Sequence, residues 1–117
     1  LSYGIILWGN CSNRELQRLF ILQKKAIRII GKLKFRDSYK TIFTQLGFLT
    51  LTCLYIFETI LFCRYKCKLT QGREIHNYHT RYNNNFRTLH HRLNVFSNLP
   101  AQAGVKLINK LPENIKN

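Results

Sequence analysis

The stretch from Arg14 to Lys32 constrains the fold most, because its apolar and cationic residues separate at the period of an α-helix. At about 100° of rotation per residue, one side of such a helix is apolar and the other is basic. The apolar side carries Leu16, Leu19, Phe20, Ala26, Ile27 and Ile30. The basic side, which we term the cationic stripe, carries Arg14, Arg18, Lys25, Arg28 and Lys32. We therefore expect one long helix with a core face and a basic face.

Both ends of this helix carry recognisable signals. Ser12 is followed three residues later by Glu15, a capping-box pattern in which each side chain satisfies a backbone N–H of the first turn. Gly31 is the expected stop, because glycine adopts the left-handed conformation that ends many helices.

The charge balance suggests a polyanionic partner. The chain has 117 residues, with 19 Lys plus Arg against 5 Asp plus Glu, and a formal net charge of +14. A surface so charged repels itself unless a polyanion neutralises it. Nucleic acid is the first partner inferred and an anionic membrane surface the second. A basic surface that is merely solvated remains the third alternative.

Shorter helices are expected on either side of the Arg14 to Lys32 helix. Residues 1–9 resemble the tail of a helix, and Asp37 or Ser38 is placed to cap another that stops at Gly47. The buried face of that second helix would carry Tyr39, Ile42, Phe43 and Leu46. The segment from Leu51 to Lys68 is apolar nearly all round, which predicts a helix at the buried centre with the Arg14 to Lys32 helix packed across it.

A membrane span over residues 46–63 is the alternative to a buried helix, and two features argue against it. The segment is about as long as a span requires, at 18 to 20 residues. Gly47 and Thr50 divide it, however, and Glu58 would cost about 3 kcal/mol near a bilayer centre. We therefore expect no membrane partner for this segment.

The helical pattern dissolves between Gln71 and Phe96, which predicts a long loop with a candidate short strand at Arg92 to Phe96. Ser97 or Asn98 would cap a last helix with Pro100 in its first turn. The core side of this helix would carry Leu107, Ile108 and Leu111. The expected fold is mainly all-α: one small helical domain over residues 1–117, with a helical part at 1–68, a basic loop at 69–98 that holds a short strand or hairpin, and a C-terminal helix within 99–117.

The predicted loop combines cations with aromatic rings, as proteins that bind single strands do. It contains all four histidines and four arginines interleaved with Tyr78, Tyr82 and Phe86. The residues we single out as candidate nucleic-acid contacts are the cationic stripe and His76, Tyr78, Arg81, Arg87 and Arg92. A plain surface loop whose aromatic rings pack on the core is an equally good interpretation.

Metal binding and catalysis are not expected from this chain. Cys63, Cys67, His76 and His79 form a C-x3-C-x8-H-x2-H array, but the spacing matches no standard zinc site, and both cysteines sit where a buried helix takes small apolar side chains. The five acids are scattered singly, so no carboxylate pair is available to hold catalytic metal ions. We predict no catalytic residue, no metal ligand and no cofactor.

The chain reads as a fragment from inside a reducing cell. It contains no methionine and begins within an apolar run, and no cationic leader precedes that run. Four cysteines are expected to be free thiols. We accordingly expect an intracellular location, in the nucleus, the cytoplasm or both.

Five segments in order resemble the C-terminal, post-thumb region of reverse transcriptases from non-LTR retrotransposons of the LINE type, similar to jockey elements. They are YGIILWG at 3–9, LQKKAIRII at 22–30, LGFLTLTCLYIFE at 46–58, HNYHTR at 76–81 and KLINKLPENIK at 106–116. The resemblance covers nearly the whole chain. Where that family tends to have a proline near Thr52, this chain has none, and Cys63 and Cys67 belong to no motif of the family.

The resemblance implies a noncatalytic tail of an RNA-directed DNA polymerase whose catalytic aspartates lie upstream. Such a tail would help to hold template RNA or target DNA during target-primed reverse transcription. Two alternatives stay open: a segment that docks on the upstream polymerase domain without touching nucleic acid, and a degenerate remnant of a transposable element. The family assigns no established role to HNYHTR, so contacts there are our own hypothesis.

Overall fold

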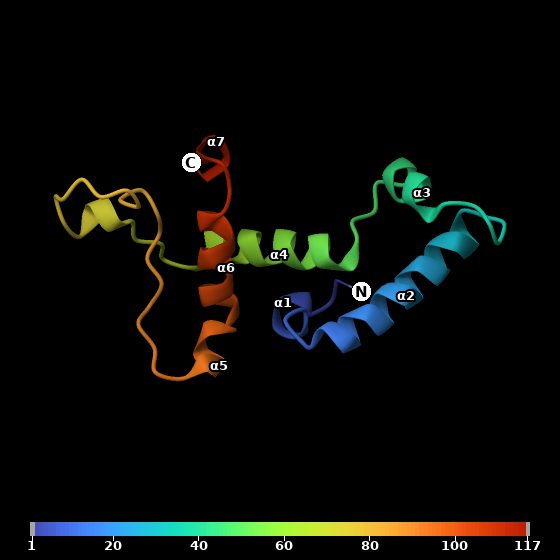
Figure 1. The fold of residues 1–117 in the computed structure, drawn as a ribbon, viewed down its shortest axis with the longest axis horizontal. Helices are drawn as coiled ribbons and strands as arrows, with labels where there is room; N and C mark the ends of the chain where they lie inside the picture. The colour runs from blue at the N-terminus through green and yellow to red at the C-terminus, as the bar shows by residue number, and fades with distance from the viewer. Residues whose placement is uncertain (1, 117) are drawn as a thin grey trace. The chain divides into compact units, whose positions relative to one another are not determined.

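The computed structural model describes residues 2–116, which are mainly helical, as the sequence predicts (Figure 1). The chain groups into two compact units, Leu1–Tyr55 and Ile56–Asn117, and the division falls inside a helix. The expectation of a single domain with internal boundaries at 68 and 98 stays a prediction.

The first unit contains α1 (Ile5–Trp8), α2 (Asn13–Ile30), α3 (Tyr39–Gln45) and the start of α4 (Leu51–Lys66). Ser12 caps α2 as predicted, with its Oγ accepting a hydrogen bond from the N–H of Glu15 at 3.5 Å. Glu15 does not complete the capping box; its carboxylate lies 3.5 Å from Arg18 instead. At the other end, Gly31 is right-handed with φ −78° and Lys32 takes the left-handed conformation at φ +49°.

Gly31 is therefore required for close packing of helices and not for a left-handed backbone conformation. A Cβ added to it would lie 3.0 Å from Cγ2 of Ile42, so its lack of a side chain lets α3 approach the end of α2. A glycine with positive φ does follow α3: Gly47, at φ +66°, comes directly after the C-cap residue Leu46. The predicted stop of the second short helix is thus confirmed.

The core face of α2 agrees with the prediction at four of its positions and not at its end. Ile27 is buried, and Leu16, Leu19 and Phe20 are half-buried, but Ala26 and Ile30 are exposed. The main helix partner of α2 is α3.

Gln23, a polar residue in the centre of the apolar face of α2, is buried and connects α2 to the start of α4. Its Nε2 donates to the carbonyl of Leu49 at 2.9 Å, and its Oε1 accepts from the N–H of Leu51 at 3.0 Å. The first N–H groups of a helix have no partner within the helix. Gln23 therefore acts as a cap for α4 from a residue distant in sequence.

Helix α3 begins and packs nearly as expected. Ser38, one of two predicted caps, accepts from the N–H of Lys40 at 3.3 Å, whereas Asp37 accepts from the N–H of Lys34. Phe43 is buried with the Tyr39 ring edge-on to it, their centroids 6.2 Å apart. Leu46, predicted to be buried, is 43% exposed because it lies past the end of the helix.

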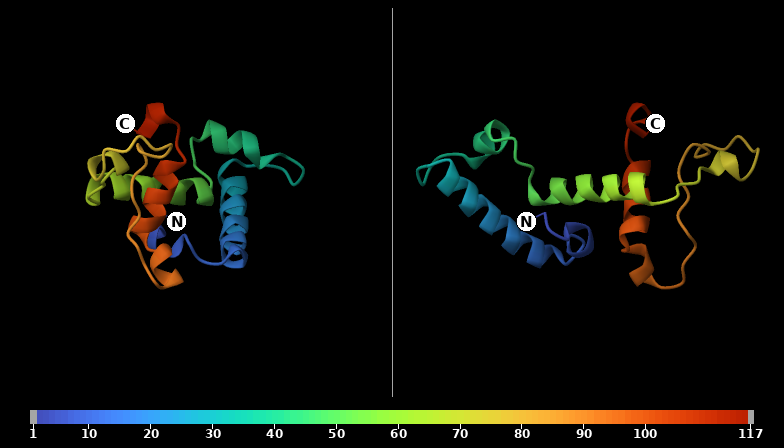
Figure 2. Two further views of the ribbon diagram at one scale, coloured as in Figure 1. Left: turned by 60° about the vertical axis from the view of Figure 1, so that its left-hand side comes forward. Right: turned by 180° about the vertical axis from the view of Figure 1, so that it is seen from behind.

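The second unit contains the rest of α4, a 3-10 helix η1 (Gly72–Glu74), α5 (Asn94–Ser97), α6 (Pro100–Asn109) and α7 (Glu113–Lys116). Its core is formed by Cys63, Val105 and Ile108. Helix α6 crosses the C-terminal half of α4 (Figure 2). Gly104 makes the close crossing feasible, because a Cβ there would lie only 2.6 Å from the Cβ of Cys63.

Helix α4 is less enclosed than its composition predicts. It ends at Lys66 instead of Lys68, and along it Leu51, Thr59 and Cys63 are buried while Phe57 is 50% and Tyr65 78% exposed. The prediction of a helix buried all round was therefore wrong, because side chains such as Phe57 and Tyr65 are exposed. None of the helices between residues 2 and 116 has the length and apolar run needed to cross a bilayer.

The segment before α6 differs most from expectation. Residues 94–97 are helical, so the predicted strand at Arg92 to Phe96 was wrong: local bonds such as Phe96 N–H to the carbonyl of Leu93 close a turn there. Leu99, not Ser97 or Asn98, is the N-cap of α6. The cause is Pro100 at the first helical position, which forces the preceding residue to be extended. The predicted inward face of α6 is confirmed at Ile108, and Leu107 is half-buried; Leu111, also half-buried, lies past the end of the helix.

Candidate nucleic-acid interface

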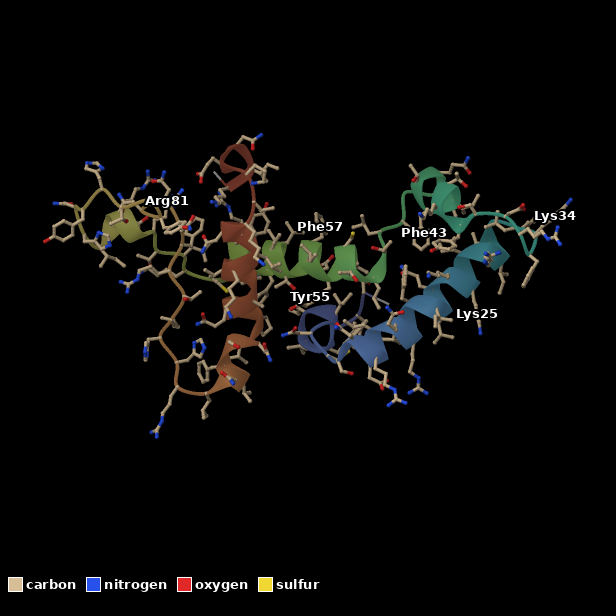
Figure 3. The ribbon with its side chains drawn as sticks, viewed as in Figure 1. Lys25, Lys34, Phe43, Tyr55, Phe57 and Arg81 are labelled. Carbon is tan, nitrogen blue, oxygen red and sulfur yellow. The ribbon has the colours of Figure 1, made fainter. Side chains whose placement is uncertain are left out.

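The cationic stripe lies along the outer side of α2 in the first unit. Arg14, Arg18, Lys25 and Lys32 are exposed and Arg28 is half-buried; Figure 3 labels Lys25. At 100° per residue the four stripe residues within α2 fall within about 80° of the helix circumference, and Lys32 lies just past its end. From Arg14 to Arg28 the stripe extends about 21 Å at 1.5 Å per residue. Such a row can lie along several successive phosphates of one strand.

Two members of the stripe have partners in the protein. Arg18 pairs with Glu15, and both are largely exposed, so the pair contributes little to stability. Arg28 donates through Nη1 to the carbonyls of Lys34 and Phe35, at 3.3 and 3.2 Å, and so holds the turn after α2. The three remaining cations of the stripe, Arg14, Lys25 and Lys32, have no ion pair among the described residues.

Lys24 is a cation that the sequence analysis did not single out. Its ammonium group lies 4.3 Å from the ring centroid of Phe20 and 4.8 Å from that of Tyr39. It is therefore held between α2 and α3 by two cation–π contacts, each of about 0.5 to 1 kcal/mol at an exposed site. The sequence did contain a signal for the first of these contacts, because Phe20 lies four residues before Lys24 and so on the same face of the helix.

The predicted loop in the second unit is closed at its base. Gln71 and Phe86 form an antiparallel bridge, and the N–H of Arg87 donates to the carbonyl of Thr70 at 2.9 Å. Asn109 of α6 fixes the end of the loop at Phe86. Its side-chain amide donates to the carbonyl of Phe86 and accepts from the N–H of Phe86, both at 2.8 Å. The segment between residues 71 and 86 is thus a bounded loop and not an open connection.

Two of the three consecutive asparagines, Asn83 and Asn85, belong to this closure. The carbonyl of Asn83 accepts from the N–H of Arg73, and the carbonyl of Asn85 accepts from the N–H of Gly72. The side chain of Asn85 accepts from Lys116 of α7, whose ammonium also contacts Glu113 at 3.0 Å. Lys116 is buried and thus serves the structure of the second unit.

The candidate contacts of the loop fall into two places. His76, Tyr78 and Arg81 lie within the closed part, where the His76 and Tyr78 rings are 5.9 Å apart and Tyr78 and Arg81 are exposed (Figure 3). Arg87 and Arg92 lie exposed on the chain that leads to α5. The stripe belongs to the first unit, so each unit presents a basic surface of its own.

Two hollows adjoin the loop. One, of about 470 Å³, is polar and lined by Arg73, His76, Asn77, His79, Asn83 and Asn84. Two residues of this lining each have a buried atom without a hydrogen-bond partner, Nδ1 of His76 and Oδ1 of Asn83. The other, of about 410 Å³, lies between the two ends of the loop and α6, and we term it the α6 groove. Sequence reasoning missed the α6 groove, whose walls come from segments far apart in the chain.

The cysteine and histidine array does not come together in the structure. Within residues 2–116 no group of three His, Cys, Asp or Glu side chains is placed to hold a metal ion. Cys63 is fully buried, and its thiol donates to the carbonyl of Ala101 at 3.6 Å. Burial, and secondarily the neighbouring Cys67, raises the pKa of the Cys63 thiol from 9.0 to about 12.

We predict that Cys63 resists alkylation in the folded chain. The thiolate is the form of cysteine that attacks iodoacetamide and displaces its iodide, so at about pH 8 the exposed Cys11 and Cys53 should react while Cys63 does not. The unfolded thiol loses its proton from pH 9.0 upward and the folded one only near pH 12, so the free energy of unfolding should fall across that interval. Mass spectrometry of the labelled peptides, with denatured chain as the control, measures the first effect. Equal labelling of Cys53 and Cys63 in folded chain would contradict it.

No family model, curated protein or solved structure matches the chain.

Proposed function

We propose that this chain is a noncatalytic nucleic-acid-binding segment, of the kind implied by its resemblance to the C-terminal region of non-LTR retrotransposon reverse transcriptases. In this proposal it contacts template RNA or target DNA alongside the upstream polymerase domain. The cationic stripe and the loop arginines bind phosphates, and the exposed Tyr78 is available to stack on a base.

The observation that carries this proposal is how few of the cations are neutralised within the protein. Among residues 2–116 there are two ion pairs, Arg18 with Glu15 and Lys116 with Glu113, for 19 Lys and Arg. A protein surface of this kind binds polyanions through counterion release, which is favourable at low salt and independent of sequence.

The test is a titration of the purified chain against a labelled single-stranded RNA and a DNA duplex at two salt concentrations. With six phosphates contacted on a single strand, the affinity should fall about 300-fold between 50 and 200 mM salt. A shallow salt dependence, or no binding at low salt, would refute the proposal.

A second candidate function is docking on the upstream polymerase domain, and exposed apolar residues of the first unit favour it. A hollow of about 470 Å³ is lined by Ala26, Ile30, Phe48, Leu49 and Leu54 among others, and Ile30 is 58% exposed. Apolar docking depends little on salt. The same titration therefore separates the two functions, because a docking segment would not bind the oligonucleotides.

A further inference from the structure

The α6 groove has the build of a small-ligand site, and the whole of it lies in the second unit. Residues 67–70 and 87–90 form two of its sides and α6 forms the third. Its volume, about 410 Å³, is within the range of ligand pockets. Leu69, Leu89 and Val105 supply apolar surface, while the exposed Lys68, Arg87 and His90 line it as well.

Gln102 on α6 lines this groove and has no hydrogen-bond partner there. The residue is 4% exposed, and its Oε1 is buried without a partner. Its side-chain amide makes no hydrogen bond to any described residue. Buried amides are nearly always hydrogen-bonded, so an orphan amide in a hollow indicates a missing partner. Gln102 and Val105 are three residues apart and share one face of α6.

We propose that the α6 groove binds one unpaired nucleobase of the bound strand, with Gln102 hydrogen-bonded to the edge of the base. A base is flat and apolar on its faces, which suits walls of leucine and valine, and it carries adjacent donors and acceptors on its edge, which suit an amide. Arg87 and Lys68 bind the flanking phosphates. The inference rests on the proposed function, to which it adds a site for the base.

Other ligand classes fit this groove less well. A free phosphate could pair with Lys68 and Arg87, but its oxygens are mainly acceptors and would leave the buried Oε1 of Gln102 without a donor. A purely apolar ligand would leave the amide unpaired, which is unfavourable in a dry site. An unpaired base is the ligand that offers donors to Gln102, flat faces to the walls and negative charge to the cations.

Uncharged nucleosides test the groove separately from phosphate binding. Adenosine, cytidine, guanosine and uridine are titrated at millimolar concentrations into isotope-labelled chain, and the side-chain amide resonance of Gln102 is followed. We expect at least one nucleoside to shift this resonance saturably. Unmoved resonances with all four would overturn the inference even where the chain binds RNA with a steep salt slope. Nucleoside binding without oligonucleotide binding would support the groove and refute the proposed function.

The variant Gln102→Leu tests the role of the amide. Leucine keeps the bulk and removes the hydrogen bonds, so preference among short homopolymer RNAs should be lost while the salt slope is unchanged. Gln45→Leu, at an exposed position of α3, is the matched control. An unaltered preference in folded Gln102→Leu would overturn the inference. If that variant does not fold, the nucleoside titration of the wild-type chain decides.

Discussion

Replacing Arg81, Arg87 and Arg92 together by alanine is expected to weaken binding of single-stranded RNA about 100-fold at about 0.1 M salt. Each phosphate contact on a single strand contributes about 0.7 to the slope of log affinity against log salt, so three contacts account for about two units of slope. All three side chains are exposed and make no hydrogen bond or ion pair with another residue that the structure describes. The helix content should therefore be unchanged, and fluorescence anisotropy at several salt concentrations measures the loss.

The matched control removes the same charge from elsewhere in the second unit. Lys66, Lys106 and Lys110 are exposed and outside the candidate interface, so the triple alanine variant should lower affinity only through net charge. If both triple variants weaken binding equally, the loop has no special place in recognition. If the loop variant loses helix content, its arginines are structural.

Replacing Gly104 by valine is expected to disrupt the packing of the second unit. The added Cβ would lie 2.6 Å from the Cβ of Cys63 and 3.1 Å from the carbonyl oxygen of Thr59, both close to the backbone of α4 and unable to turn aside. Overpacking of this kind costs about 3 kcal/mol and outweighs the gain of about 1 kcal/mol from removing a helical glycine. The melting temperature should drop by more than about 10 °C.

Ala103→Val is the control for the lower helix propensity of a β-branched residue. Ala103 is the preceding residue of α6 and is only half-buried, so this substitution should change the melting temperature by much less. Thermal unfolding followed by circular dichroism compares the two variants. A Gly104→Val chain as stable as wild type would show that the crossing of α6 over α4 is looser than the structure describes.

Local sequence signals predicted the elements and not their connections. Helix α2 was predictable because its apolar and basic residues separate at helical period, and Ser12 marks its start. The role of Gln23 as a cap of α4 was not predictable. A lone polar residue in an apolar face does not show that it bonds to Leu49 and Leu51 on another segment. The N-cap at Leu99 was predictable from Pro100, because the residue before a proline is extended. The general preference for Ser or Asn at N-caps pointed instead to Ser97 or Asn98.

For the candidate interface, exposure was predictable and arrangement was not. A charged residue such as Arg14 or Arg81 lies at the surface by default. The closure of the loop depends on Asn109, which is 23 residues from Phe86, and the α6 groove depends on Gln102. Contacts between residues so far apart in the chain produce no periodic pattern in the sequence. The family, the function and the intracellular location inferred from the sequence stay predictions.

The residues that close the base of the loop are different from the residues that are exposed on the loop. The bridge between Gln71 and Phe86, the carbonyls of Asn83 and Asn85 and the amide of Asn109 maintain the closure. Positions 77–82 between them are exposed. Because these side chains are exposed and take no part in the closure, replacing them should leave the second unit folded, so shape and surface chemistry are set by different residues of one loop.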